Sequence, residues 1–65
     1  MENSKKERIV EELKKAGELA TTKISFLISA NLYQTEKYLD ELEAAGIIEK
    51  NQKNNATYWK IKDGV

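Results

Sequence analysis

The stretch "NLYQTEKYLDELEAAG", residues 31–46, decides the fold, because it reads as one helix with a defined start and end. Asn31 can cap the first turn, and Gln34 stands three residues later, which is the spacing of a capping box. Gly46 stands where a residue with left-handed backbone commonly ends a helix. The apolar spacing predicts an inward stripe formed by Thr35, Leu39 and Leu42.

The outer face of this helix carries two kinds of side chain. Near its start it offers Tyr33, Gln34 and Lys37, which are residue types that reach base edges in DNA. Further along, the face is acidic, with Glu36, Asp40, Glu41 and Glu43. A phosphate backbone repels such acids, so the residues alone allow either a recognition helix or the central strut of a small domain.

Composition bounds the class of protein. The chain has 65 residues, which is the size of one small domain, 1–65. It holds neither cysteine nor histidine, so a disulfide, a thiolate metal site and the usual general base are excluded. Its serines have no histidine to activate them, and its three glycines form no phosphate-binding loop. We therefore expect no enzyme, no catalytic residue, no metal and no cofactor.

Hydropathy places the chain in solution. Apolar residues make up 40% of the sequence, enough for a small core, and no apolar run approaches the roughly 20 residues needed to span a bilayer. The first ten residues, "MENSKKERIV", lack the apolar stretch of a signal peptide. We expect a cytoplasmic protein without a membrane partner.

The net charge is zero, but its distribution is uneven. Residues 36–49 contain one lysine and five acids, whereas residues 50–62 contain four lysines and no acid. A basic patch acts locally, within a Debye length of roughly 8–10 Å, so the second segment remains a candidate phosphate-binding surface. The same lysines would also protect an exposed sheet edge from pairing with another chain.

Two helices are predicted before residue 31. The first spans about 4–16, with Ser4 and Glu7 as a capping-box pair and Gly17 as its end. The lysine pairs at 5–6 and 14–15 are expected to be solvated. After a brief strand at Leu19, Thr21 or Thr22 is expected to cap a short helix over about 22–28.

After Gly46 the apolar period changes from 3.6 to 2, which predicts a hairpin over about 47–62. Asn54 and Asn55 tolerate the positive φ that a tight hairpin turn requires. The expected core consists of Ile9, Val10, Leu13, Leu19, Ile24, Ile28, Leu39, Leu42, Ile47, Trp59 and Ile61. Two helices joined by a tight turn, the second of them long and well capped, form a helix-turn-helix. The hairpin that follows them is a wing.

The chain resembles the winged helix-turn-helix family, of the minimal kind common in archaeal and bacterial transcription regulators. The resemblance rests on "TTKISFLISANLYQTEKYLDELEAAGIIEK" and on the closing "ATYWKIK". It implies an α+β fold of three helices and a small antiparallel β-hairpin wing. It also implies duplex DNA binding in transcriptional regulation, with the third helix in the major groove.

The resemblance assigns a set of DNA-contacting positions. Near the third helix they are Asn31, Leu32, Tyr33, Gln34 and Lys37, and in the wing they are Lys50, Lys53, Asn54 and Asn55, with Lys60 and Lys62 behind. Gln34 could read adenine, and Lys37 could read guanine. Asn31 and the helix N-terminus suit a phosphate.

Two features leave alternatives open. Lys37 is the single basic residue of the third helix, and no arginine follows Arg8, so one copy is poorly supplied for guanine readout. A homodimer or a larger assembly would double the contacts. Alternatively, the domain binds a protein through an apolar surface formed by Phe26, Leu27, Leu32 and Tyr33, unless these side chains are extra core.

Overall fold

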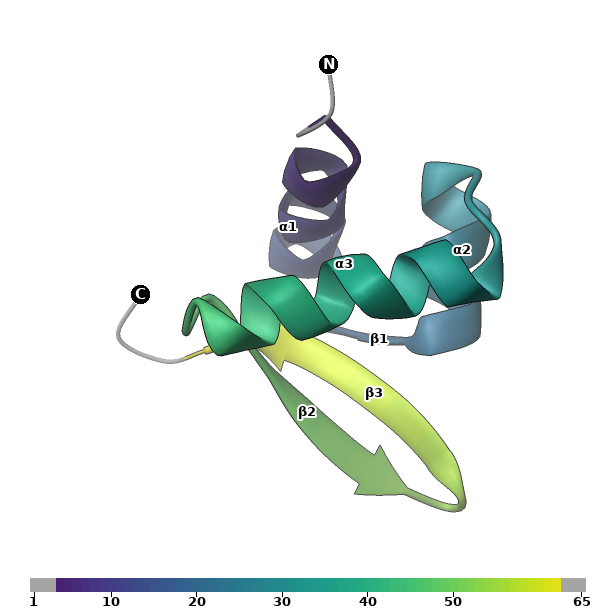
Figure 1. Ribbon diagram of the computed structural model, residues 1–65. Helices are drawn as coiled ribbons and strands as arrows, with labels where there is room; N and C mark the ends of the chain where they lie inside the picture. Colours follow the sequence, from purple (N-terminus) through teal and green to yellow (C-terminus); the bar gives the residue numbers. More distant parts are fainter. Residues whose placement is uncertain (1–3, 63–65) are drawn as a thin grey trace.

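The computed structural model describes residues 4–62, which form three helices and three strands (Figure 1). In chain order the elements are α1 (Ser4–Ala16), β1 (Glu18–Ala20), α2 (Thr21–Ile28), α3 (Leu32–Ala44), β2 (Ile48–Lys53) and β3 (Ala56–Ile61). The predicted order and the α+β class are therefore confirmed. The expected helix boundaries differ from the observed ones by one residue at most. In α3 the two extra residues that the sequence predicted, Asn31 and Ala45, are the caps of the helix.

The sheet is antiparallel, and its strand order is β1-β3-β2. The wing is the β2–β3 hairpin, which extends away from the helices in Figure 1. The short strand β1 adds a third strand by pairing with β3, with Leu19 opposite Trp59. Because Ile48 and Lys50 lie opposite Ile61 and Trp59, one face of the hairpin turns toward the helices.

Four tight turns connect the elements of residues 4–62, and each contains positive φ, at Gly17, at Ser29, at Gly46 and at Asn54 with Asn55. Ser29 ends α2 at φ 57°, and the N–H of Ala30 donates to the carbonyl of Ser25 at 3.1 Å, which closes the helix-turn-helix. Asn54 and Asn55 turn the wing with φ of 54° and 63°, as the sequence predicts for a type I′ hairpin turn.

The core lies where the helices meet the inner face of the sheet. Its buried apolar residues are Ile9, Leu13, Ile24, Ile28, Leu39, Leu42, Ile48 and Trp59. Val10, Leu19, Ile47 and Ile61 are only partly buried around it. The expectation was wrong by one position in the first strand of the wing, because Ile48, and not Ile47, pairs with Ile61 on the inner face. A shift of one residue moves a side chain to the other face of a strand.

Thr21 does not cap α2, contrary to expectation. The helix begins at Thr21 itself, its N-cap residue is Ala20, and no side chain caps it. The Thr21 hydroxyl instead accepts a hydrogen bond of 2.8 Å from Trp59 Nε1 and lies 3.4 Å from the carbonyl oxygen of Thr57, to which it donates. This hydroxyl gives the buried indole its polar partner, and thereby ties α2 to β3.

The lysines at the start of α1 are not simply solvated. Lys5 Nζ donates to the Ile28 carbonyl at 2.8 Å, where a cation suits the C-terminus of α2. Lys6 forms an ion pair with Glu41 of α3. The two side chains therefore connect the first helix to the other two, whereas Lys14 and Lys15 are exposed as expected. The expected capping role of Ser4 concerns a side chain outside the described set.

No helix within residues 4–62 is long and apolar enough to cross a membrane. Over the same residues, the acidic side chains form no group of three or more that could hold a metal ion.

Candidate nucleic-acid interface

The first turn of α3 is held in place by its own cap. Asn31 Oδ1 accepts a hydrogen bond of 2.7 Å from the Gln34 N–H, which confirms the predicted capping role of Asn31. The buried Thr35 hydroxyl donates to the Asn31 carbonyl at 2.8 Å. Because both ends of the first turn are bonded, the residues between them, Leu32 and Tyr33, project from a rigid helix start.

Two side chains of this turn point into solvent. Tyr33 is 71% exposed and Leu32 is 45% exposed. Lys37 Nζ lies 5.9 Å from the centre of the Tyr33 ring, one turn further along the same face. The predicted contact residues Tyr33 and Lys37 therefore share one exposed surface, where an aromatic ring and a cation are available together.

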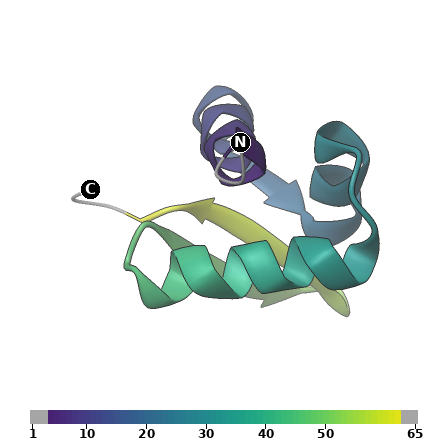
Figure 2. The ribbon, with the colours of Figure 1, turned by 45° about the horizontal axis from the view of Figure 1, so that its top comes forward.

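A hollow of about 290 Å³ lies between α3, the start of α2 and the tip of the wing. It is lined by Ala20, Thr21, Thr22, Leu32, Glu36, Asn55, Ala56 and Thr57. In both ribbon views the first turn of α3 and the hairpin tip lie toward the same end of the molecule (Figures 1 and 2). Two predicted contact positions, Leu32 at the start of α3 and Asn55 at the wing tip, line this hollow. The other predicted helix positions, Tyr33, Gln34 and Lys37, do not.

Acidic side chains limit how much of α3 can approach a polyanion. Glu36 lines the hollow, and Asp40 and Glu43 are exposed further along the helix. Gln34 lies seven residues before Glu41, and thus on nearly the same side of the helix, where Glu41 contacts Lys6 of α1. Gln34 is not among the residues that line the hollow, so its role in base readout stays a prediction.

Charges on the outer face of the sheet are paired across three strands. The Glu18 carboxylate of β1 accepts hydrogen bonds from Lys53 Nζ at 2.8 Å and from Asn51 Nδ2 at 3.2 Å, both on β2. Since β3 lies between β1 and β2, these bonds span the whole width of the sheet. The hydrogen bond from Lys53 holds the pKa of Glu18 below its ordinary value of 4.5, and the same bond raises the pKa of Lys53.

The other wing lysines also have local partners. Lys60 Nζ lies 3.6 Å from Glu49 Oε2 on the neighbouring strand. Lys50 Nζ lies 5.6 Å from the centre of the Trp59 ring, and Lys53 Nζ lies 5.3 Å from that of Tyr58. The positive charge of residues 50–62 is thus partly neutralised by two acids outside that segment, Glu18 and Glu49. Sequence reasoning missed Glu18, although its place in a strand beside the wing was a signal.

The wing tip itself is polar and exposed. A second hollow, of about 440 Å³, is lined by Gln52, Lys53, Asn54, Asn55 and Thr57. The predicted positions Lys53, Asn54 and Asn55 therefore meet at the tip. Lys50 and Lys60 lie further back along the strands, nearer the body of the domain.

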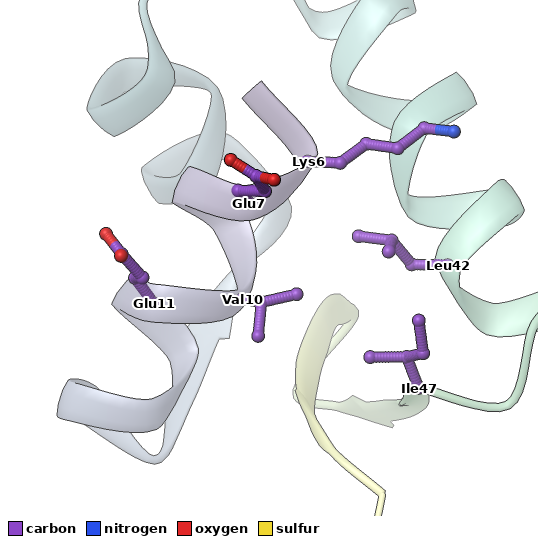
Figure 3. A pocket seen from close by; sticks show the side chains of 6 residues that line it. All are labelled: Lys6, Glu7, Val10, Glu11, Leu42 and Ile47. Atoms are coloured by element: carbon purple, nitrogen blue, oxygen red, sulfur yellow. The ribbon is translucent and has the colours of Figure 1, made fainter. Parts of the chain in front are cut away.

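A third hollow lies away from this surface, between α1, the end of α3 and the start of β2 (Figure 3). Its volume is about 480 Å³. Val10 projects toward Leu42 and Ile47 there, and Lys6 extends past them toward α3 (Figure 3). Its apolar floor and its position at the opposite end of α3 separate it from the helix start and the wing tip.

Solved structures with the same fold include DNA-binding domains. The homodimeric winged helix-turn-helix DNA-binding domain of a Mycobacterium bovis protein, described as a possible ArsR-family regulator, has a TM-score of 0.86 and 24% identity. That match covers 91% of this chain and 54% of the other. MarR from Escherichia coli, complexed with operator DNA, has a TM-score of 0.84 and 17% identity over 94% of this chain and 46% of that one.

A third similar structure is a Zα domain of Carassius auratus PKZ in complex with Z-DNA. Its TM-score is 0.81 at 15% identity, and the match covers 92% of this chain and 95% of that one. These likenesses establish the winged helix-turn-helix fold. The present chain spans about half the length of the M. bovis domain.

Family membership rests on the sequence itself. No curated protein matches the chain significantly. The model of the FaeA-like protein family, however, matches residues 5–63, which is nearly the whole sequence and includes all three helices and the wing. The chain belongs to the family of FaeA-like proteins.

Proposed function

We propose that the chain binds duplex DNA, as a cytoplasmic transcriptional regulator or as the DNA-binding part of one. The observation that carries this proposal is the hollow shared by the start of α3, the start of α2 and the wing tip. A capped helix start beside a projecting hairpin can enter a major groove while the hairpin contacts the flanking backbone. MarR in complex with operator DNA and the Zα domain in complex with Z-DNA share this fold, and their complexes support the proposal that the chain binds DNA.

The proposed contacts divide into two groups. Tyr33, Gln34 and Lys37 face the bases, and Asn31 with the N-terminus of α3 faces a phosphate. In the wing, the backbone contacts come from Lys50, Lys53, Asn54, Asn55 and Lys60. Since Lys53 and Lys60 are paired with acids in the free protein, binding must exchange those pairs for phosphates.

The charge of the surface favours action as more than one copy. Lys37 is the single cation of α3, and Glu36 lies inside the hollow. Two copies would present two helices to half-sites about one helical turn apart and would double the number of lysines. The homodimeric state of the M. bovis domain supports this arrangement.

The direct test is an NMR titration of ¹⁵N-labelled protein with a short duplex at two salt concentrations. We expect shifts at residues 31–37 and 50–60 that shrink at high salt, because phosphate contacts release counterions. Lys37→Ala should lower the salt slope by about one. The matched control is Lys14→Ala, which removes the same charge from an exposed position on α1. An absence of shifts at low salt would refute DNA binding.

A second candidate function, binding to a protein partner, is favoured by the exposure of one apolar side chain. Phe26 on α2 is 76% exposed, and it does not line the hollow beside α3. Leu27 beside it is half-buried, so part of the predicted apolar surface is real and part is core. If this surface binds a protein, Phe26→Ser should abolish concentration-dependent association in sedimentation measurements while DNA binding is retained.

A further inference from the structure

We infer that the start of α3 reads thymine through its C5-methyl group, with Leu32 and Tyr33 as the specificity-determining residues. This inference rests on the proposed DNA binding and goes beyond it, because it names the base feature that is recognised. The first observation is exposure. The described residues include three large exposed apolar side chains, and two of them, Leu32 and Tyr33, occupy consecutive positions at the tip of the helix proposed to enter the groove.

Exposed apolar side chains at this position have one natural partner in DNA. Each A·T pair presents a thymine methyl in the major groove, and apolar contact with that methyl is a recognised form of direct readout. Leu32 has no polar atom in its side chain, so it can contribute to base readout only in this way. The tyrosine ring beside it widens the apolar contact, and its hydroxyl remains free to reach a phosphate.

Hydrogen-bonded readout of guanine is poorly provided for on the same surface. No arginine occurs after Arg8, and the one cation of α3, Lys37, lies over the Tyr33 ring. A bidentate arginine is the commonest specific contact to guanine. The side chains that remain, two of them apolar, favour A·T pairs over G·C pairs.

The hollow beside Leu32 has the matching character. Alanine and threonine side chains, which carry methyl groups, make up most of its lining, and Glu36 is its single charged residue. A carboxylate repels phosphate and accepts hydrogen bonds from amino groups, which adenine and cytosine both present in the major groove. The methyl group is therefore the feature that distinguishes an A·T pair here. A base edge with a methyl and an amino group therefore suits this surface better than the sugar-phosphate backbone does.

The test compares duplexes that differ only in this methyl group. The full chain is titrated by fluorescence anisotropy against an alternating A·T duplex and against the same duplex with deoxyuridine in place of thymidine. In an alternating duplex every base pair carries the methyl, so the binding register need not be known. We expect binding to the thymidine duplex to be about fourfold tighter or more, since burying one methyl-sized group contributes about that factor.

Two kinds of control show which residues and which chemical group cause the preference for thymidine: variants of the protein and a second pair of duplexes. Leu32→Ala should lower the ratio of the two affinities, and the double variant Leu32→Ala/Tyr33→Ala should bring it close to one. Phe26→Ala, at an exposed apolar residue outside the hollow, should leave the ratio unchanged. In an alternating G·C duplex, 5-methylcytosine in place of cytosine should strengthen binding, because it puts a methyl at the same groove position. If Leu32→Ala does not fold, the two wild-type comparisons still decide the question.

The outcomes separate the two proposals. Salt-dependent binding with equal affinity for the thymidine and deoxyuridine duplexes would overturn methyl readout and leave DNA binding intact. A methyl effect of undiminished size in Leu32→Ala would overturn the assignment to Leu32. Failure to bind any of the duplexes at low salt would overturn both the readout and the proposed function.

Discussion

At the scale of single residues, one hydroxyl satisfies the only indole of the protein. Thr21 Oγ1 accepts from Trp59 Nε1, and Trp59 is buried. Thr21→Val keeps the shape of the side chain and leaves the indole N–H without this partner. We expect the free energy of unfolding to fall by about 1–3 kcal/mol, the cost of an unsatisfied buried donor. Urea denaturation measures it, and Thr22→Val at the exposed neighbouring position is the control; equal effects would contradict the assigned role.

In the turn of the helix-turn-helix, a single residue, Ser29, carries backbone strain. Ser29 adopts φ 57°, in a region where a Cβ atom is strained and glycine is not. Ser29→Gly should therefore raise the free energy of unfolding by about 1 kcal/mol. Ser29→Ala retains the Cβ and should give no such gain, which separates backbone strain from loss of the hydroxyl. Thermal unfolding of the two variants side by side makes the comparison.

At the scale of elements, the wing is tied to β1 by the bonds that Glu18 accepts from Lys53 and Asn51. Glu18→Gln removes a negative charge beside the proposed backbone contact and releases Lys53. We expect DNA affinity to rise and the salt slope to steepen by up to about one, because one more lysine can neutralise a phosphate. Glu12→Gln removes an equal charge from α1, where Glu12 pairs with Arg8, and serves as the control. Unchanged affinity in Glu18→Gln would place Lys53 outside the footprint.

Contacts between neighbouring residues could be predicted from the sequence, whereas contacts between distant residues could not. The α3 cap at Asn31 and the wing turn at Asn54 and Asn55 depend on neighbours within a few residues, and both were predicted. The pairing of Glu18 with Lys53 joins residues 35 apart, and that of Thr21 with Trp59 joins residues 38 apart. Such contacts depend on strand register and helix docking, which local propensity does not fix. For this reason the cap of α3 could be predicted from the sequence, but the pairing of the wing lysines with acids could not.

At the scale of the whole molecule, stability should depend on pH mainly on the acid side. Hydrogen bonds from Arg8, Lys53 and Lys6 hold the pKa values of Glu12, Glu18 and Glu41, respectively, below the ordinary 4.5. A carboxyl whose pKa is lower in the folded state adds stability above its unfolded pKa, and that stability is lost as the pH falls through the folded value. The chain has no histidine or cysteine side chain that would titrate between pH 6 and 8.

We therefore expect the urea midpoint to be nearly constant from pH 6 to 8 and to fall below about pH 4.5. The fall should be modest, because all three ion pairs lie at the surface, although Glu12 and Glu18 are half-buried and only Glu41 is fully exposed. It should shrink in high salt, which screens surface pairs. Glu18→Gln should show a smaller acid-side loss than the parent chain, since one of the three groups can no longer take up a proton. A midpoint that rises on acidification would mean that repulsion among the acids of α3 outweighs these pairs.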